Sequence, residues 1–385
     1  MIGRRTRLIL WLPLIFGAVL AAVGLQVLFG GRSTRFDEMA LGKETSSYWA
    51  KIGDYPIHCS PPVDADKCLQ GFKARGASEA ALWLGNSQVH AINQMKAGDT
   101  NAPPLLHATL RERFGLDLLT FSQPNANLQE HLVLFQYLRA RVPTKVLILP
   151  LVFDDLRETG LRSEIAAALD DPPTDQALAR SDVGRRIVKQ ARASADAVAA
   201  IGSGKDDLKA LRETTQEKTE LFFNRWLDEH SPLWKTRKEA RGALMENLFF
   251  LRNRILGITA QTARPLIAAR RDMNIAALQE ILATAQAAGI RVFVYIVPIR
   301  NDVAIPYVPA EYEEFKKNAH DIATRYGASF SNLEGVVPAR YWGTKASTNL
   351  GGGQEIDFMH FQGPGHRILA EALADFLRAP DLKNR

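Results

Sequence analysis

The chain has 385 residues, of which 46% are hydrophobic and 23% are charged, which is the balance of a folded globular protein. The formal net charge is only +6, and the Lys and Arg residues are scattered along the chain rather than clustered. We therefore do not expect a nucleic-acid-binding surface.

The N-terminus predicts a single membrane anchor. Three arginines precede residues 8–29, a stretch without any charged side chain. As a helix this stretch would rise about 33 Å, enough to cross a hydrocarbon core. Basic residues on the leading side imply that the N-terminus stays in the cytoplasm, so that the main domain lies outside the cytoplasmic membrane, in the periplasm or its equivalent. A cleaved signal peptide, with Ala21 and Ala22 near the cut, is the alternative.

We accordingly expect residues 1–31 to form the anchor and residues 32–78 to form a juxtamembrane linker or cap. The only two cysteines, Cys59 and Cys68, lie in this linker. In an oxidising compartment a disulfide between them is expected, and two unpaired thiols are the alternative.

From residue 79 onward, short apolar runs alternate with stretches of helical periodicity. The predicted strands are 80–84, 118–121, 145–152, 291–298 and 328–333, and the predicted helices are 105–114, 128–142, 275–288, 310–326 and 364–377. This order predicts an α/β fold with a parallel sheet and helices on both of its faces. The sheet domain is expected in two parts, residues 79–154 and 272–385.

A helical insertion, residues 155–271, is expected between these two parts. It is rich in Ala and in charged residues, and 220–227 and 244–256 carry concentrated apolar faces. Two interpretations are open. The apolar faces pack on one another in a helical subdomain, or they form a lid that touches lipid or a membrane partner.

Ser87 follows the first predicted strand, on the turn Gly85-Asn86-Ser87. Open parallel sheets bind ligands beyond the carboxyl ends of their strands, so Ser87 should share one edge with residues 122–127, 153–155 and 298–302. At that edge Ser87 is expected to be a nucleophile. The alternative is a hydroxyl that caps the next helix.

A serine nucleophile needs a base, and His360 is the strongest of the eight histidines. It is expected in a glycine-loosened loop just before the last helix, and such a loop can return to the sheet edge. Asp357, three residues earlier, can orient the imidazole and fix its tautomer. His366 lies nearby in sequence but should point along the last helix, away from the edge.

Together, the Gly85-Asn86-Ser87 turn and the Asp357-x-x-His360 pair resemble the SGNH (GDSL-type) hydrolase superfamily. The resemblance implies a three-layer α/β/α, flavodoxin-like fold and a triad of Ser87, His360 and Asp357. The N-terminal anchor and the strand end at Arg300 make the chain look like the DltD and AlgX/AlgJ-like branch. Members of that branch are exported, anchored partners of membrane-bound O-acyltransferases.

The chain departs from the superfamily at the end of the third strand, where residues 152–155 contain no equivalent of its Gly-x-Asn-Asp block. The oxyanion donors are therefore expected elsewhere. The backbone N–H of Ser87 is one, and the side-chain amide of Asn125 or Asn127 is the other. Loss of one such donor costs about 100- to 1000-fold in rate, which suits a slow transferase better than a fast hydrolase.

Arg300 and Asn301 stand at the same edge and are candidates for holding a sugar or an anionic group. A capped strand end with exposed polar side chains is the alternative for both. The histidines are dispersed, so neither a metal site nor a cofactor is expected.

These features predict an anchored acyltransferase that moves an acetyl or similar acyl group onto a cell-envelope or extracellular polysaccharide. Its expected partner is a membrane-bound O-acyltransferase of the MBOAT type. Two alternatives stay open: an exported carbohydrate esterase or deacetylase, and a non-catalytic glycan-binding scaffold subunit.

Overall fold

The computed structural model describes residues 50–59, 65–89, 94–96, 98–202, 250–259, 261–347 and 353–377. The expected anchor, 8–29, and the apolar stretch 220–227 lie outside these residues. In the described residues, no helix combines the length and hydropathy that a membrane span needs.

The chain divides into two units. The larger unit comprises Glu44–Asp196, Ala260–Lys345 and Gln354–Arg385, and it contains the sheet with its helices. The smaller unit comprises Met1–Lys43, Ala197–Thr259 and Ala346–Gly353. Its described part includes the end of one long helix and a further helical segment at 250–255. The domain boundaries expected from the sequence remain predictions.

A six-stranded sheet in which every pairing is parallel forms the centre of the larger unit. Its strands are β3 (His58–Cys59), β4 (Ala80–Gly85), β5 (Asp117–Ser122), β6 (Thr144–Leu151), β7 (Arg291–Ile296) and β8 (Ser329–Asn332). All five predicted strands are confirmed. They were readable because β4, β6 and β7 are covered on both faces, which demands continuous apolar runs.

The strands follow one another across the sheet in the order β3-β5-β4-β6-β7-β8. Without the edge strand β3, this is the order 2-1-3-4-5 of flavodoxin-like folds. The chain runs from β4 outward to β5 on one side and then returns to β6 on the other side. The topological switch point therefore lies between β4 and β6, and ligands of such folds bind at its carboxyl side.

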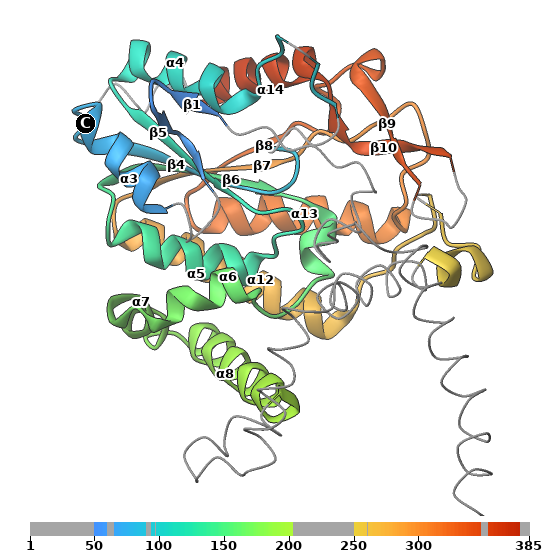
Figure 1. The fold of residues 1–385 in the computed structure, drawn as a ribbon, viewed down its shortest axis with the longest axis horizontal. Helices are drawn as coiled ribbons and strands as arrows, with labels where there is room; N and C mark the ends of the chain where they lie inside the picture. Colours follow the sequence, from blue (N-terminus) through green and yellow to red (C-terminus); the bar gives the residue numbers. More distant parts are fainter. Residues whose placement is uncertain are drawn as a thin grey trace, which may run out of the picture. The chain divides into compact units, whose positions relative to one another are not determined.

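Helices cover both faces of this sheet, as Figure 1 shows, and the architecture is three-layer α/β/α. One face carries α4 (Ala102–Phe114) and α14 (Gly363–Phe376), which pack with Trp83 and Phe293 in one apolar cluster. The other face carries α5 (Leu128–Arg139), α12 (Ala268–Ala287) and α13 (Pro309–Arg325), which pack with Leu82, Leu147 and Val294. All five predicted helices of the sheet domain are confirmed.

The described part of the expected insertion is mainly helical. It contains η1 (Phe153–Leu156), α6 (Ser163–Ala166), η2 (Ala167–Asp170), α7 (Pro172–Leu178) and α8 (Asp182–Gly202). Asp171 begins α7 by accepting hydrogen bonds from the backbone N–H and the hydroxyl of Thr174.

The region expected as a linker contributes to the sheet. It contains β1 (Lys51–Ile52), β2 (Tyr55–Pro56) and α3 (Ala65–Ala74), and β3 pairs with β5 at the sheet edge. The predicted disulfide between Cys59 and Cys68 is present and joins β3 to α3. β3 was not predicted, because a strand of two residues leaves no periodic signal in a sequence.

A second small sheet lies at the C-terminal end of the domain. A short turn of 3-10 helix, η4 (Ala339–Tyr341), leads into β9 (Trp342–Ala346), which pairs with β10 (Gln354–Phe361). The sequence predicted a loose loop around His360, and this was wrong, because Asp357 and His360 both lie on β10. The glycines that suggested a loop precede β10, where the chain connects it to β9.

Candidate active site

Ser87 lies at the switch point of the sheet, just beyond the end of β4. Gly85 ends β4 and stands opposite Ser122, the last residue of β5. A Cβ atom at Gly85 would lie 2.9 Å from the Cβ of Ser122 and 2.7 Å from Val89 Cγ2. A glycine is therefore needed for the chain to turn this closely against β5.

The residues around Ser87 form a tight turn. Asn86 accepts two hydrogen bonds: its backbone oxygen accepts one from the N–H of Val89 (3.1 Å), and its side-chain Oδ1 accepts one from the N–H of Gln88 (3.1 Å). Ser87 stands at the tip of this turn and is 7% exposed. The N–H groups of Gln88 and Val89 donate to Asn86 and not to the Ser87 hydroxyl.

Asp357 and His360 form a buried acid–base pair on β10. Asp357 Oδ2 lies 2.8 Å from His360 Nδ1, and the two side chains are only 2% and 6% exposed. Asp357 Oδ1 accepts hydrogen bonds from the backbone N–H groups of Met359 and His360, both at 3.0 Å. These local bonds let two side chains three residues apart on a strand meet, although strand geometry alone would turn them to opposite faces.

The charge of Asp357 follows from its surroundings. Burial acts to raise the pKa of this carboxyl, but the attraction of His360, its hydrogen bond, and the ammonium of Lys345 outweigh burial, and the pKa lies below its ordinary value. An ionised carboxylate can only accept, so Nδ1 of His360 carries the proton and donates it. In the neutral ring the other nitrogen, Nε2, is the acceptor.

His360 Nε2 is buried, and it has no hydrogen-bond partner among the described residues. Buried polar atoms normally have partners, so an unpartnered base in this place is typical of a functional site. Ser87 Oγ and His360 Nε2 share no hydrogen bond in this structure, although both residues are described. Such catalytic bonds are often long before substrate binds.

One short segment after β7 contacts both halves of this arrangement. The side-chain amide of Gln88 donates to the backbone oxygen of Pro298 (2.5 Å), and the N–H of Arg300 donates to the backbone oxygen of Phe358 (3.1 Å). The turn that holds Ser87 and the strand that holds the acid–base pair are thus attached to the same three residues.

Arg300 has a structural role here. Its guanidinium donates to both carboxylate oxygens of Asp302 (2.7 and 3.0 Å) and to the backbone oxygen of Gly343 on β9 (3.0 Å). These bonds fasten β9 to the end of β7 and engage all three guanidinium nitrogens. Asn301 is exposed beside it. The structure therefore favours the alternative of a strand end with exposed polar residues over a substrate-binding pair.

The two asparagines expected as oxyanion donors have different positions. Asn127 caps α5: its Oδ1 accepts from the N–H groups of Gln129 and Glu130 (3.0 Å each), and its Nδ2 donates to the backbone oxygen of Gly160 (2.9 Å). Asn125 is exposed, and its backbone is left-handed, with φ of 54°. Neither position favours an oxyanion donor.

Two further histidines lie near this edge. Burial lowers the pKa of His366 to about 3, aided by the nearby His360, and its ring packs 4.6 Å from the ring of Phe361. His58 is hydrogen-bonded through Nε2 to the hydroxyl of Ser122, and both residues are 1% exposed. Ser122 and His58 are therefore a hydrogen-bonded Ser–His pair, and both side chains are buried.

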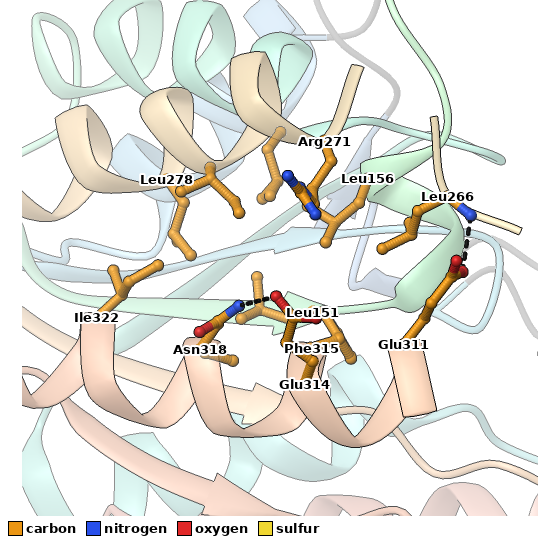
Figure 2. A pocket seen from close by; sticks show the side chains of 13 residues that line it. Leu151, Leu156, Leu266, Arg271, Leu278, Glu311, Glu314, Phe315, Asn318 and Ile322 are labelled. Atoms are coloured by element: carbon orange, nitrogen blue, oxygen red, sulfur yellow. Dashed lines mark hydrogen bonds between the residues drawn. The ribbon is translucent and has the colours of Figure 1, made fainter. Parts of the chain in front are cut away.

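An apolar pocket lies elsewhere, between α12 and α13 (Figure 2). Leucines, Ile275, Phe315 and Ile322 line it. Glu311 accepts the backbone N–H of Leu266 at 2.8 Å. None of the proposed triad residues lines this pocket, and it contains no serine or histidine.

Comparisons with known proteins give a distant structural likeness and no match in sequence. Neither a scan against protein-family models nor a search of curated proteins gives a match. Among solved structures, the chain resembles a variant of Axe2, an acetyl-xylooligosaccharide esterase from Geobacillus. The likeness covers 80% of this chain and 98% of that chain, at 10% identity and a TM-score of 0.36. At these values it does not bear on activity.

Within the described residues, no group of His, Cys, Asp and Glu side chains is arranged to hold a metal ion.

Proposed function

We propose that this protein transfers acyl groups through a triad of Ser87, His360 and Asp357. The observation that carries the proposal is the buried Asp357–His360 pair, whose Nε2 is a base without a partner. The turn that holds Ser87 stands at the switch point of the same sheet edge and is tied to the same segment as β10. Nucleophile, base and orienting acid are the parts that serine acyl transfer needs.

The proposed steps follow from these atoms. Ser87 Oγ attacks the acyl carbon while its proton passes to His360 Nε2. The imidazolium formed is stabilised by the Asp357 carboxylate, and it then returns the proton to the departing alcohol. An acyl group is left on Ser87. A hydroxyl of the acceptor then attacks this ester with the roles of His360 repeated.

For the acceptor we propose a cell-envelope or extracellular polysaccharide, and for the acyl group an acetyl or similar small group. The support is the expected anchor at 8–29, which would hold the domain at the outer side of the cytoplasmic membrane. The disulfide between Cys59 and Cys68 fits an oxidising compartment outside the cytoplasm. A membrane-bound O-acyltransferase of the MBOAT type would then supply the acyl group.

The test is intact-mass analysis after exposure to nitrophenyl acetate. Wild type should gain one acetyl group, and Ser87→Ala and His360→Ala should gain none. Ser122→Ala is the matched control, because it removes the serine at this edge that is hydrogen-bonded to His58. It should be acetylated like wild type. Labelling that persists in Ser87→Ala and disappears in Ser122→Ala would refute the assignment.

Water in place of a sugar hydroxyl would make the same site an esterase or deacetylase. The rate at which the acetyl group leaves Ser87, with and without added polysaccharide, separates the two activities. Acceleration by polysaccharide with appearance of acetylated sugar indicates a transferase, and equal loss in buffer indicates an esterase.

One observation favours a non-catalytic scaffold as a second candidate: Ser87 and His360 share no hydrogen bond. A folded wild-type protein that binds polysaccharide but never forms an adduct would support this reading.

A further inference from the structure

The side chain of Asn86, next to the proposed nucleophile, carries an unused hydrogen-bond donor. The residue is 3% exposed, and its Nδ2 has no hydrogen-bond partner within the described part of the chain. A buried amide donor without a partner is costly, and proteins rarely retain one without a use. Nothing in the packing of the turn requires an amide nitrogen at this place.

The identity of the free atom does not depend on the choice of amide orientation. Oδ1 of Asn86 accepts the backbone N–H of Gln88 at 3.1 Å, and an N–H can donate only to the oxygen of the amide. Turning the amide over would place two donors against each other. The unpartnered atom is therefore the NH₂ group, which is a donor.

This donor is held in place before any substrate arrives. The backbone N–H of Gln88 fixes Oδ1, and Gln88 is itself fixed by the hydrogen bond that its side-chain amide donates to the backbone oxygen of Pro298. The backbone oxygen of Asn86 is also engaged, by the N–H of Val89. A preorganised donor of this kind stabilises developing charge without reorganisation during the reaction.

We propose that Asn86 Nδ2 is an oxyanion-hole donor of this enzyme. The inference rests on the proposed function and supplies the donor that the end of β6 lacks. When Ser87 Oγ bonds to the acyl carbon, the π electron pair of the carbonyl moves to its oxygen. Nδ2 of Asn86 donates a hydrogen bond to that oxyanion. The pair returns to form the carbonyl again when the bond to the leaving alcohol breaks, and the alcohol takes its proton from His360.

This assignment replaces both asparagines that the sequence suggested. The side-chain amide of Asn127 caps α5 and donates a hydrogen bond to the backbone oxygen of Gly160. Asn125 is exposed in a turn. Asn86 is the asparagine in the Ser87 turn itself, and its free donor is buried.

The experiment measures single-turnover acetylation of Ser87 by nitrophenyl acetate in the full chain. Asn86→Asp keeps an oxygen for the N–H of Gln88 and removes the donor, and Asn86→Ala removes the donor without adding charge. We expect both variants to acylate about 100- to 1000-fold more slowly than wild type. The substrate concentration at half-maximal rate should change little, because the donor acts on the transition state. Asn125→Asp is the comparison and should match wild type.

Each outcome decides the question. Wild-type rates in both Asn86 variants overturn the inference and leave the proposed function intact. A slow Asn86→Asp beside a normal Asn86→Ala also overturns it, because the added charge then explains the defect. If the acetylation rate falls in Asn125→Asp but not in the Asn86 variants, Asn125 is the donor instead. No adduct in wild type refutes the proposed function and this inference with it. Unfolding transitions like those of wild type show that the variants are folded.

Discussion

Replacing Asp357 by Asn tests whether this carboxylate selects the tautomer of His360. Oδ1 of Asp357 accepts two backbone N–H groups, from Met359 and His360. In Asp357→Asn the amide oxygen must therefore keep this position, and the amide NH₂ group must face His360 Nδ1. Nδ1 then has to accept, so the proton of the neutral ring moves to Nε2. A protonated Nε2 cannot take the proton of Ser87.

The expected loss is large, although the shape of the site is preserved. In serine proteases the same replacement costs about 10⁴-fold in rate through the same tautomer change, which equals about 5 kcal/mol of barrier. We expect the acetylation rate of Ser87 in Asp357→Asn to fall by about this factor.

Two measurements check this reasoning independently. Stopped-flow release of nitrophenol, confirmed by intact mass, gives the rate. The ¹⁵N chemical shifts of the His360 ring report the tautomer whether or not the protein is an enzyme. A rate within about tenfold of wild type would refute the proposed role of Asp357 in catalysis. An unchanged tautomer would refute the argument from the two backbone bonds, whatever the rate.

Three further predictions concern stability. Replacing Cys59 and Cys68 together by Ser should lower the free energy of unfolding by about 2.5 kcal/mol in urea titrations, because the short loop between them is no longer closed; equal stability of the oxidised and reduced proteins would contradict this. His131 is fully buried and its pKa is lowered from 6.5 to about 3. As the pH falls, the unfolded chain therefore takes up a proton at this residue before the folded protein does. The free energy of unfolding of wild type should fall by about 2 kcal/mol from this cause between pH 7 and pH 5, and this part of the fall should be absent in His131→Leu. Parallel pH profiles of the two proteins would exclude this. Leu147 is fully buried on a central strand, and Leu147→Ala should cost about 2–5 kcal/mol at an unchanged denaturant slope; a cost below about 1 kcal/mol would show that the site collapses around the smaller side chain.

The sequence was most informative where burial is complete. The central strands are apolar on both sides, so β6 and β7 could be placed almost to the residue. β10 was mistaken for a loop because its two ends differ: its start is exposed and follows glycines, and only its end is buried. The pair of Asp357 and His360 was found all the same, because its spacing is a local property of the chain.

Roles that depend on distant partners were not readable from the sequence. Arg300 looked like a ligand for a sugar, but the backbone oxygen that it binds belongs to Gly343, 43 residues away. Asn127 is different, because its role is local: the predicted helix 128–142 begins at the next residue, and an Asn in that place is a common helix cap. The free donor of Asn86 depends on how the turn folds, and no motif in the sequence could have shown which of its two amide atoms is engaged.

The placement of the acid and the base on one short hairpin has a consequence for how activity is lost. Asp357 and His360 meet within a segment of four residues near the end of the chain. Ser87 lies on a segment near the start of the sheet domain's sequence. The hairpin is fastened to the sheet by hydrogen bonds such as those from Arg300 to Phe358 and Gly343, and by the buried rings of Trp342, Phe358 and Phe361. Partial unfolding can open β9 and β10 while the six-stranded core stays closed. Denaturant or heat should then abolish acyl transfer well before the helices unfold. This loss of activity should be reversible.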